Sequence, residues 1–159
     1  MRILLVEDNA DHRTLMTHAL SMHNPTWQVH GAVSGEEALR CLQKETFALV
    51  FLDYSLPGWD GLEVLQAIRR EQGPPVVLVT GRGDEQVAVA AMQAGAYDYV
   101  VKHEGYLHRL PVIAQRAVEV HQLALDHTRA EQALRESEER YRRVVELSPE
   151  AILIFQSEC

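Results

Sequence analysis

Residues 2–9 read RILLVEDN, an apolar run of strand length that ends in two acids. Four further runs of strand length follow, at residues 28–32, 48–52, 76–79 and 97–101. The first, third and fourth of the five runs are nearly all apolar, which is typical of strands covered on both faces. Stretches with apolar residues at three-to-four spacing separate the runs and indicate amphipathic helices. This alternation predicts an α/β fold with a parallel sheet between helices.

The expected architecture is a doubly wound, five-stranded parallel sheet with the flavodoxin-like strand order 2-1-3-4-5. The first helix should turn Leu15, Ala19, Leu20 and Met22 toward the core. The stretch from Ser34 to Glu37 has the form of a capping box. Local start signals and the global pattern therefore favour the same fold.

A fifth helical stretch is expected from about Tyr106, with Pro111 in its first turn. The next helix-breaking residue is Pro149, so this helix should be long and continue past the end of the sheet domain. Its apolar residues fall near a heptad seam, interrupted by His127 and Ser137, and comprise Val120, Leu123, Ala130, Leu134, Tyr141 and Val144. The seam predicts a homodimer through a weak coiled coil.

The composition is that of a folded globular chain of 159 residues with 47% hydrophobic and 24% charged residues. A net charge of −8 removes the electrostatic attraction to phosphates that nonspecific nucleic-acid binding needs. Two cysteines form no disulfide framework or zinc spacing, and no apolar run reaches membrane-spanning length. We therefore expect a cytoplasmic protein that binds neither nucleic acid nor membrane.

Acidic residues stand where two of the predicted strands end. Glu7 and Asp8 follow the first strand, and Asp53 ends the third. In the expected strand order these two strands flank the switch point, so the three carboxylates should meet in one crevice. Their mutual repulsion would be relieved by a hard cation with oxygen ligands, and Mg²⁺ suits this set best.

The other strand ends supply the remaining groups that phosphoryl transfer to a carboxylate requires. Asp53 would be the nucleophile, Asp8 a direct metal ligand and Glu7 a ligand through water. Thr80 ends the fourth strand and offers a hydroxyl donor, while Lys102 follows the fifth and offers a point charge for a phosphate oxygen. The sequence thus predicts a phosphoacceptor site built around Asp53.

These residues resemble the response regulator receiver domain of two-component signalling over about residues 1–122. The resemblance rests on five motifs in order: LLVEDN (4–9), Asp53 with PG (57–58) and DGL (60–62), VTG (79–81), AGA (94–96) and YDYVVK (97–102). It implies a phosphoprotein that accepts its phosphoryl group from a sensor histidine kinase or a phosphotransfer protein. It implies no enzymatic turnover beyond the protein's own phosphorylation and slow dephosphorylation.

The same resemblance implies further roles for single residues. The backbone carbonyl of Ser55 would complete the metal site, and Tyr99 would switch position when the Thr80 hydroxyl is drawn to the phosphoryl group. Ser55 and Arg82 would flank the pocket and tune the lifetime of the phosphoryl group. The family usually has a cis proline after the lysine, whereas this chain has His103. We therefore expect either a trans or a strained peptide bond there.

Residues 138–152 resemble the entry to a PAS sensor domain. The expected organisation is a receiver domain at 1–122, a helical linker at 123–147 and the beginning of a truncated PAS domain at 148–159. The chain would then be part of a multidomain regulator whose receiver signals through the C-terminal helix to a downstream domain.

Two other functions are compatible with the sequence. One is a dimerisation or scaffold module in which the long helix acts regardless of phosphorylation. The other is a hydrolase that uses Asp53 as its nucleophile, although no cap insertion separates the strands. None of the eight histidines pairs with another at ligand spacing together with a third ligand, and His12, His18, His121 and His127 are interpreted as solvated helix positions.

Overall fold

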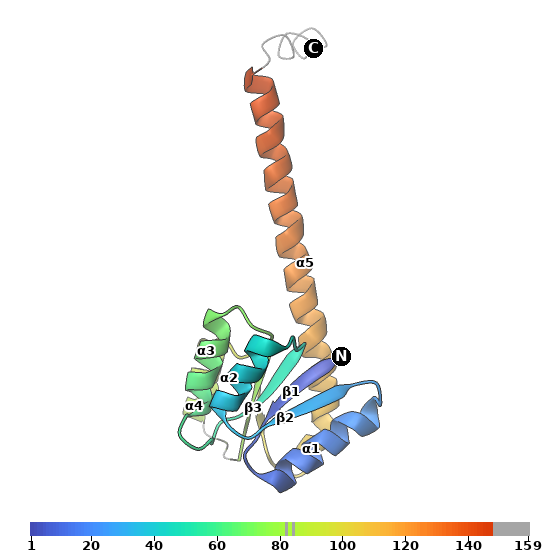
Figure 1. The fold of residues 1–159 in the computed structure, drawn as a ribbon, viewed down its shortest axis with the longest axis vertical. Coiled ribbons are helices and arrows are strands. Elements are labelled where there is room, and N and C mark those ends of the chain that lie inside the picture. Colours follow the sequence, from blue (N-terminus) through green and yellow to red (C-terminus); the bar gives the residue numbers. More distant parts are fainter. Residues whose placement is uncertain (82, 84, 148–159) are drawn as a thin grey trace. The chain divides into compact units, whose positions relative to one another are not determined.

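The computed structural model describes residues 1–81, 83 and 85–147 (Figure 1). Five strands alternate with five helices along this part of the chain. The elements are β1 (Arg2–Val6), α1 (Ala10–His23), β2 (Gln28–Ala32), α2 (Gly35–Lys44), β3 (Leu49–Asp53), α3 (Gly61–Arg70), β4 (Val76–Thr80), α4 (Glu85–Gln93), β5 (Asp98–Val101) and α5 (Tyr106–Leu147). The predicted strands and helices are therefore present.

All strand pairs are parallel, and the sheet has the order β2-β1-β3-β4-β5. The strands β1 and β3 are neighbours in register, with Ile3 opposite Leu49 and Val6 opposite Leu52. The carboxyl ends of these two strands therefore lie side by side. The predicted fold and strand order are confirmed.

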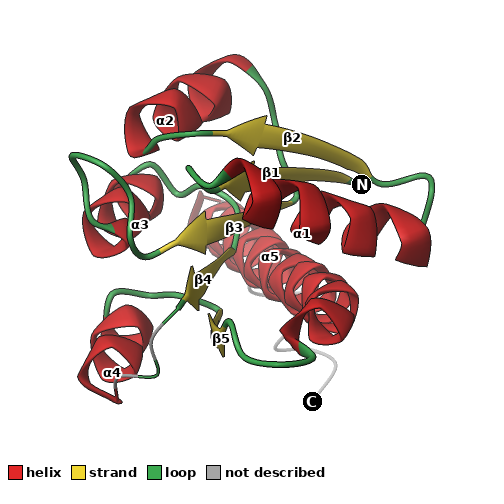
Figure 2. Cartoon of the chain, turned by 90° about the horizontal axis from the view of Figure 1, so that it is seen from below, coloured by secondary structure: helices red, strands yellow, loops and turns green. Residues whose placement is uncertain are grey.

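Helices cover both faces of the sheet, α1 and α5 on one and α2, α3 and α4 on the other (Figure 2). Successive residues of β1 contribute to different cores because side chains alternate across a strand. Ile3 and Leu5 pack in the cluster with Leu110 of α5, whereas Leu4 and Val6 pack in the cluster with Val64 of α3. This double burial explains the nearly unbroken apolar strands.

Capping side chains determine where the helices near the acidic residues begin. The Asn9 side chain accepts the backbone N–H of His12 at 3.0 Å and so starts α1 directly after the two acids. Asp60 starts α3 with a reciprocal capping box to Glu63. Ser34 accepts the Glu37 N–H, but the Glu37 carboxylate accepts from Val33, one residue before the expected partner.

Two local predictions are wrong. The face of α1 that enters the core carries Met16 and Leu20, while Leu15 and Met22 are exposed. The helix is amphipathic only weakly, so its local spacing does not decide which apolar residues are buried, and contact with the sheet does. The helix α5 begins at Tyr106, as expected, but Pro111 is its sixth residue and therefore lies in the second turn instead of the first.

The chain divides into two compact units, with the boundary between His121 and Gln122. Within the first unit, α5 buries Leu110, Ile113, Ala114 and Ala117 in the core. Within the second unit, every residue from Gln122 to Val144 is exposed. The expected beginning of a PAS domain at 148–159 lies outside the described residues. Among the helices of the described part, none is long and apolar enough to cross a membrane.

Candidate functional site

The sheet brings the five predicted strand-end residues to one edge. Glu7 and Asp8 follow β1, Asp53 ends β3, Thr80 ends β4 and Lys102 follows β5. All five line one hollow of about 640 Å³ at this edge. The parallel sheet accounts for this convergence, because the carboxyl ends of all its strands meet on one side.

Three carboxylates meet in this hollow. One oxygen each of Glu7, Asp8 and Asp53 lies within 4.8 Å of the others. Glu7 and Asp53 are buried, with 1% and 6% of their surface exposed, whereas Asp8 is exposed. Among the described residues, this is the group of acidic, histidine or cysteine side chains spaced to hold a metal ion. The all-oxygen donor set fits a hard cation such as Mg²⁺.

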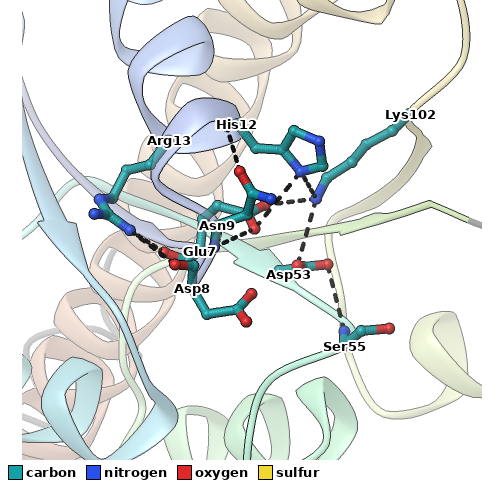
Figure 3. A network of polar contacts seen from close by, with 8 residues as sticks. All are labelled: Glu7, Asp8, Asn9, His12, Arg13, Asp53, Ser55 and Lys102. Carbon is teal, nitrogen blue, oxygen red and sulfur yellow. Dashed lines mark hydrogen bonds and ion pairs between the residues drawn. The ribbon is translucent and has the colours of Figure 1, made fainter.

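The ammonium of Lys102 lies among the carboxylates (Figure 3). Its Nζ donates to Glu7 Oε2 at 2.5 Å and to Asp53 Oδ2 at 3.3 Å. Only 9% of the lysine side chain is exposed. One buried cation therefore offsets part of the charge of three clustered acids, and the balance stays negative.

Electrostatics leave Asp53 with an unusual protonation equilibrium. The pKa of its carboxyl is raised to about 6, because burial, the largest cause, and the charge of Glu7 outweigh the lowering by Lys102 and by the N–H of Ser55. Burial opposes the charge on Lys102, but the hydrogen bond to Glu7 and the two carboxylate charges outweigh this effect and raise the pKa of the ammonium. The charged form of Asp53 therefore costs free energy in the folded protein, which suits a carboxylate that reacts with an electrophile.

The turn after β3 holds Asp53 from the backbone side. The N–H of Ser55 donates to Asp53 Oδ1 at 3.3 Å, and the N–H of Gly61 donates to the carbonyl of Tyr54 at 2.8 Å. A side chain at Gly61 would meet the Asp53 carbonyl oxygen at 2.8 Å, so this position has no room for one. The turn orients the acid, and the Ser55 carbonyl as a metal ligand stays a prediction.

The residues assigned to a switch lie next to this site. Thr80 is buried at the end of β4, two per cent exposed. Tyr99 on β5 is half-buried and packs against the core cluster that includes Val64 and Ala91. The switch roles of Thr80 and Tyr99 stay predictions.

The loop after Lys102 has no cis peptide bond, and none occurs among the described residues. The N–H of Lys102 donates to the Thr80 carbonyl at 2.7 Å, and the N–H of His103 donates to the Val101 carbonyl at 2.8 Å. The chain beyond these bonds, from His103 to Gly105, is exposed.

Two residues of α1 belong to the site although sequence reasoning missed them. His12 was interpreted as solvated, but its Nδ1 lies 3.3 Å from Lys102 Nζ and its ring lines the hollow. Arg13 Nη1 donates to the backbone carbonyls of Glu7 at 2.6 Å and Asp8 at 3.4 Å. The available signal was their place in the first turn of the helix that directly follows the acids.

Comparison with known proteins gives a family match over most of the described fold. The family described as the response regulator receiver domain matches residues 3–110. The chain is 38% identical over 121 residues to the methanogenesis regulatory protein FilR1 of Methanothrix harundinacea, covering 73% of this chain and 27% of that protein. It is 41% identical over 100 residues to the transcriptional regulatory protein AfsQ1 of Streptomyces coelicolor, covering 63% and 44%. The chain therefore spans less than half the length of these relatives.

Solved structures agree with this family match. NtrX from Brucella abortus superposes with a TM-score of 0.73 at 34% identity, covering 80% of this chain and 29% of that one. The BeF₃-activated receiver domain of DrrB gives a TM-score of 0.65 at 27% identity, covering 74% and 97%.

Proposed function

Because this chain belongs to the response regulator receiver domain family, we propose that Asp53 is the residue on which it accepts a phosphoryl group. One observation carries the proposal. Asp53 is a buried carboxylate with two acidic neighbours within metal-sharing distance and a lysine ammonium at 3.3 Å. The donor of the phosphoryl group would be the phosphohistidine of a sensor kinase or of a phosphotransfer protein.

The proposed metal is Mg²⁺, held by the carboxylates of Glu7, Asp8 and Asp53 and by the backbone carbonyl of Ser55. When bound, it would neutralise charge on the phosphoryl oxygens. The exposed Asp8 is the acid open to the hollow, while the buried Glu7 is already engaged by Lys102. This difference supports Asp8 as the direct ligand and Glu7 as a ligand through water.

In the transfer step an oxygen of Asp53 attacks the phosphorus atom and the phosphorus–nitrogen bond to the donor imidazole breaks. The imidazole leaves with its electron pair and takes a proton, so the product is an acyl phosphate. Lys102 would hold one phosphoryl oxygen with its ammonium, and Thr80 would donate its hydroxyl to another. Both groups lie at the ends of neighbouring strands, and the sheet sets their spacing.

Signal output is proposed to pass through Tyr99 and α5. A move of Thr80 toward the phosphoryl group would leave space that Tyr99 fills. Val100 of β5 and Leu110 of α5 belong to the same core cluster, which offers a route from the strand to the helix. In this proposal residues 1–122 form the receiver, residues 123–147 link it to a downstream domain and residues 148–159 begin a PAS domain. The compartment would be the cytoplasm.

The experiment is phosphorylation with acetyl phosphate and Mg²⁺, followed by intact-mass measurement. We expect one added phosphoryl group in the parent and none in Asp53→Asn. Asp126→Asn in the exposed part of α5 is the matched control and should be modified like the parent. Equal modification of Asp53→Asn and the parent would overturn the assignment. Omission of Mg²⁺ should abolish the reaction, and a rate unchanged by EDTA would contradict the proposed metal.

We further propose that two copies pair through the seam on the second unit. Leu123, Leu134 and Val144 are all more than 60% exposed, and such a row on a helix suits a coiled-coil partner. Sedimentation velocity over a range of concentrations should show a monomer–dimer equilibrium that Leu134→Asp shifts to monomer. A monomer at all concentrations would contradict the proposed dimer.

Family membership disfavours a phosphorylation-independent scaffold as the main function.

A further inference from the structure

The Lys102 ammonium has three acceptors within hydrogen-bond distance. They are Glu7 Oε2 at 2.5 Å, Asp53 Oδ2 at 3.3 Å and His12 Nδ1 at 3.3 Å (Figure 3). A lysine ammonium carries three N–H groups and no acceptor. The number of partners therefore equals the number of donors, and His12 provides one of the three.

The geometry also determines the role of the His12 ring. Because the ammonium can only donate, a hydrogen bond at this contact requires Nδ1 as the acceptor and the ring proton on Nε2. The same Nδ1 lies 3.8 Å from Glu7 Oε1, which is too long for a hydrogen bond. The imidazole is thus within hydrogen-bond distance of the lysine and not of the glutamate.

The backbone places His12 firmly. Its N–H donates to the Asn9 side chain that caps α1, which fixes the first turn against the end of β1. The backbone of Lys102 bonds to Thr80 but is followed by the exposed residues 103–105. The lysine side chain also has a flexible four-carbon stem, so the backbone alone does not fix the position of the ammonium. Side-chain acceptors must therefore hold the ammonium beside Asp53.

We propose that His12 is a positioning residue that anchors Lys102 beside the phosphoacceptor. This inference rests on the proposed function of Asp53 for its consequence, while the anchor itself exists without phosphorylation. Glu7 and Asp53 have a second task in the proposed metal site, whereas His12 is outside the acidic triad. His12 thus remains available to the ammonium when the two acids engage a cation.

Two substitutions separate the acceptor from the shape of the ring. His12→Asn keeps a side-chain oxygen near the position of Nδ1, and His12→Phe keeps a ring but removes the acceptor. The first measurement is acetylation of Lys102 by an N-hydroxysuccinimide ester in EDTA, read by peptide mass spectrometry. We expect labelling of Lys102 to rise about threefold or more in His12→Phe and less than twofold in His12→Asn. Lys44 in the same digest is the exposed internal reference.

The second measurement is the affinity for beryllofluoride in the presence of Mg²⁺. The lost hydrogen bond is partly exposed and worth about 1 kcal/mol, so His12→Phe should bind about fivefold more weakly, with His12→Asn close to the parent. Urea unfolding should show that both variants remain folded.

The inference is overturned if Lys102 labelling in His12→Phe equals that of the parent, or if His12→Asn behaves like His12→Phe. It is also overturned if both variants bind beryllofluoride as the parent does. If the parent fails to bind beryllofluoride while the labelling follows the expected pattern, the anchor stands and the proposed function of Asp53 fails.

Discussion

The strand β3 and the part of α5 that lies in the second unit are two regular elements that are stabilised in opposite ways. Every residue of β3 is buried, from Leu49 to Asp53. Every residue from Gln122 to Val144 of α5 is exposed. The strand is stabilised by burial, which also carries the reactive acid into a low-dielectric environment. The helix makes local side-chain contacts one turn apart, such as the 3.0 Å hydrogen bond that Gln122 Nε2 donates to Asp126 Oδ1.

This difference predicts where the protein tolerates substitutions without loss of stability. A buried strand transmits any change in volume or charge to the acidic site at its end, because protein interiors are close-packed. An exposed helix with its own backbone hydrogen bonds tolerates change unless a partner covers it. Four substitutions test this contrast.

Phe51→Ala should have the largest effect. Phe51 is the largest of the fully buried side chains, and its truncation should lower the free energy of unfolding by about 3–5 kcal/mol. Urea unfolding followed by circular dichroism measures the loss. A loss below 1 kcal/mol would contradict the view that β3 is held by burial.

Asp53→Asn should stabilise the metal-free protein at neutral pH. The pKa of Asp53 rises from 3.8 to about 6 on folding, so the folded state holds the extra proton between these pH values. The cost of the charged form therefore grows as pH rises from about 4 to 6, and is complete above 6. Asparagine avoids that cost, which is on the order of 3 kcal/mol at pH 7. Unfolding in EDTA should show the gain at pH 7 and little at pH 4; a gain independent of pH would contradict the stated cause.

Arg13→Ala should have a smaller effect. The guanidinium bonds to the carbonyls of Glu7 and Asp8 in a partly exposed setting, so its loss should cost about 1 kcal/mol. The weaker hold on these acids should also reduce Mg²⁺ affinity, measured by titration of the intrinsic tryptophan fluorescence. Arg116→Ala, on an exposed position of α5, is the control and should leave Mg²⁺ affinity unchanged. Parent-like affinity in Arg13→Ala would show that Arg13 does not shape the site.

Leu134→Ala should have the smallest effect on the unfolding of the monomer. The side chain is 61% exposed, so the change should stay within about 0.5 kcal/mol at protein concentrations where the chain is monomeric. The measurement is urea unfolding under dilute conditions. A larger loss there would mean that this part of α5 is packed within its own chain.

Much of the fold was predictable because its signals are local. The apolar run of β1 and the run of apolar residues that makes up β4 before Thr80 indicated a sheet covered on both sides, and the structure confirms it. The first helix was harder. Both Met16 and Leu15 are apolar, and only the contact with the sheet selects Met16 for the core.

The candidate site shows the same division. Glu7, Asp8 and Asp53 could be grouped from sequence, since parallel strands end at the same edge. For His12 and Arg13 the sequence offered only their place in the first turn after the acids, which does not say what their side chains contact. Their partners depend on how the first turn of α1 is rotated by the Asn9 cap, and no spacing rule gives that rotation.

The sequence by itself determined the parallel sheet, the acids at its edge and the long final helix, because strand alternation, apolar runs and caps act over a few residues. The tertiary structure decided which acid is buried, which residues of α1 reach the site and how Lys102 is held. These features join residues as far as 95 positions apart, such as Glu7 and Lys102. Contacts between residues so far apart in sequence depend on the packing of the helices on the sheet, so they form only when the chain folds.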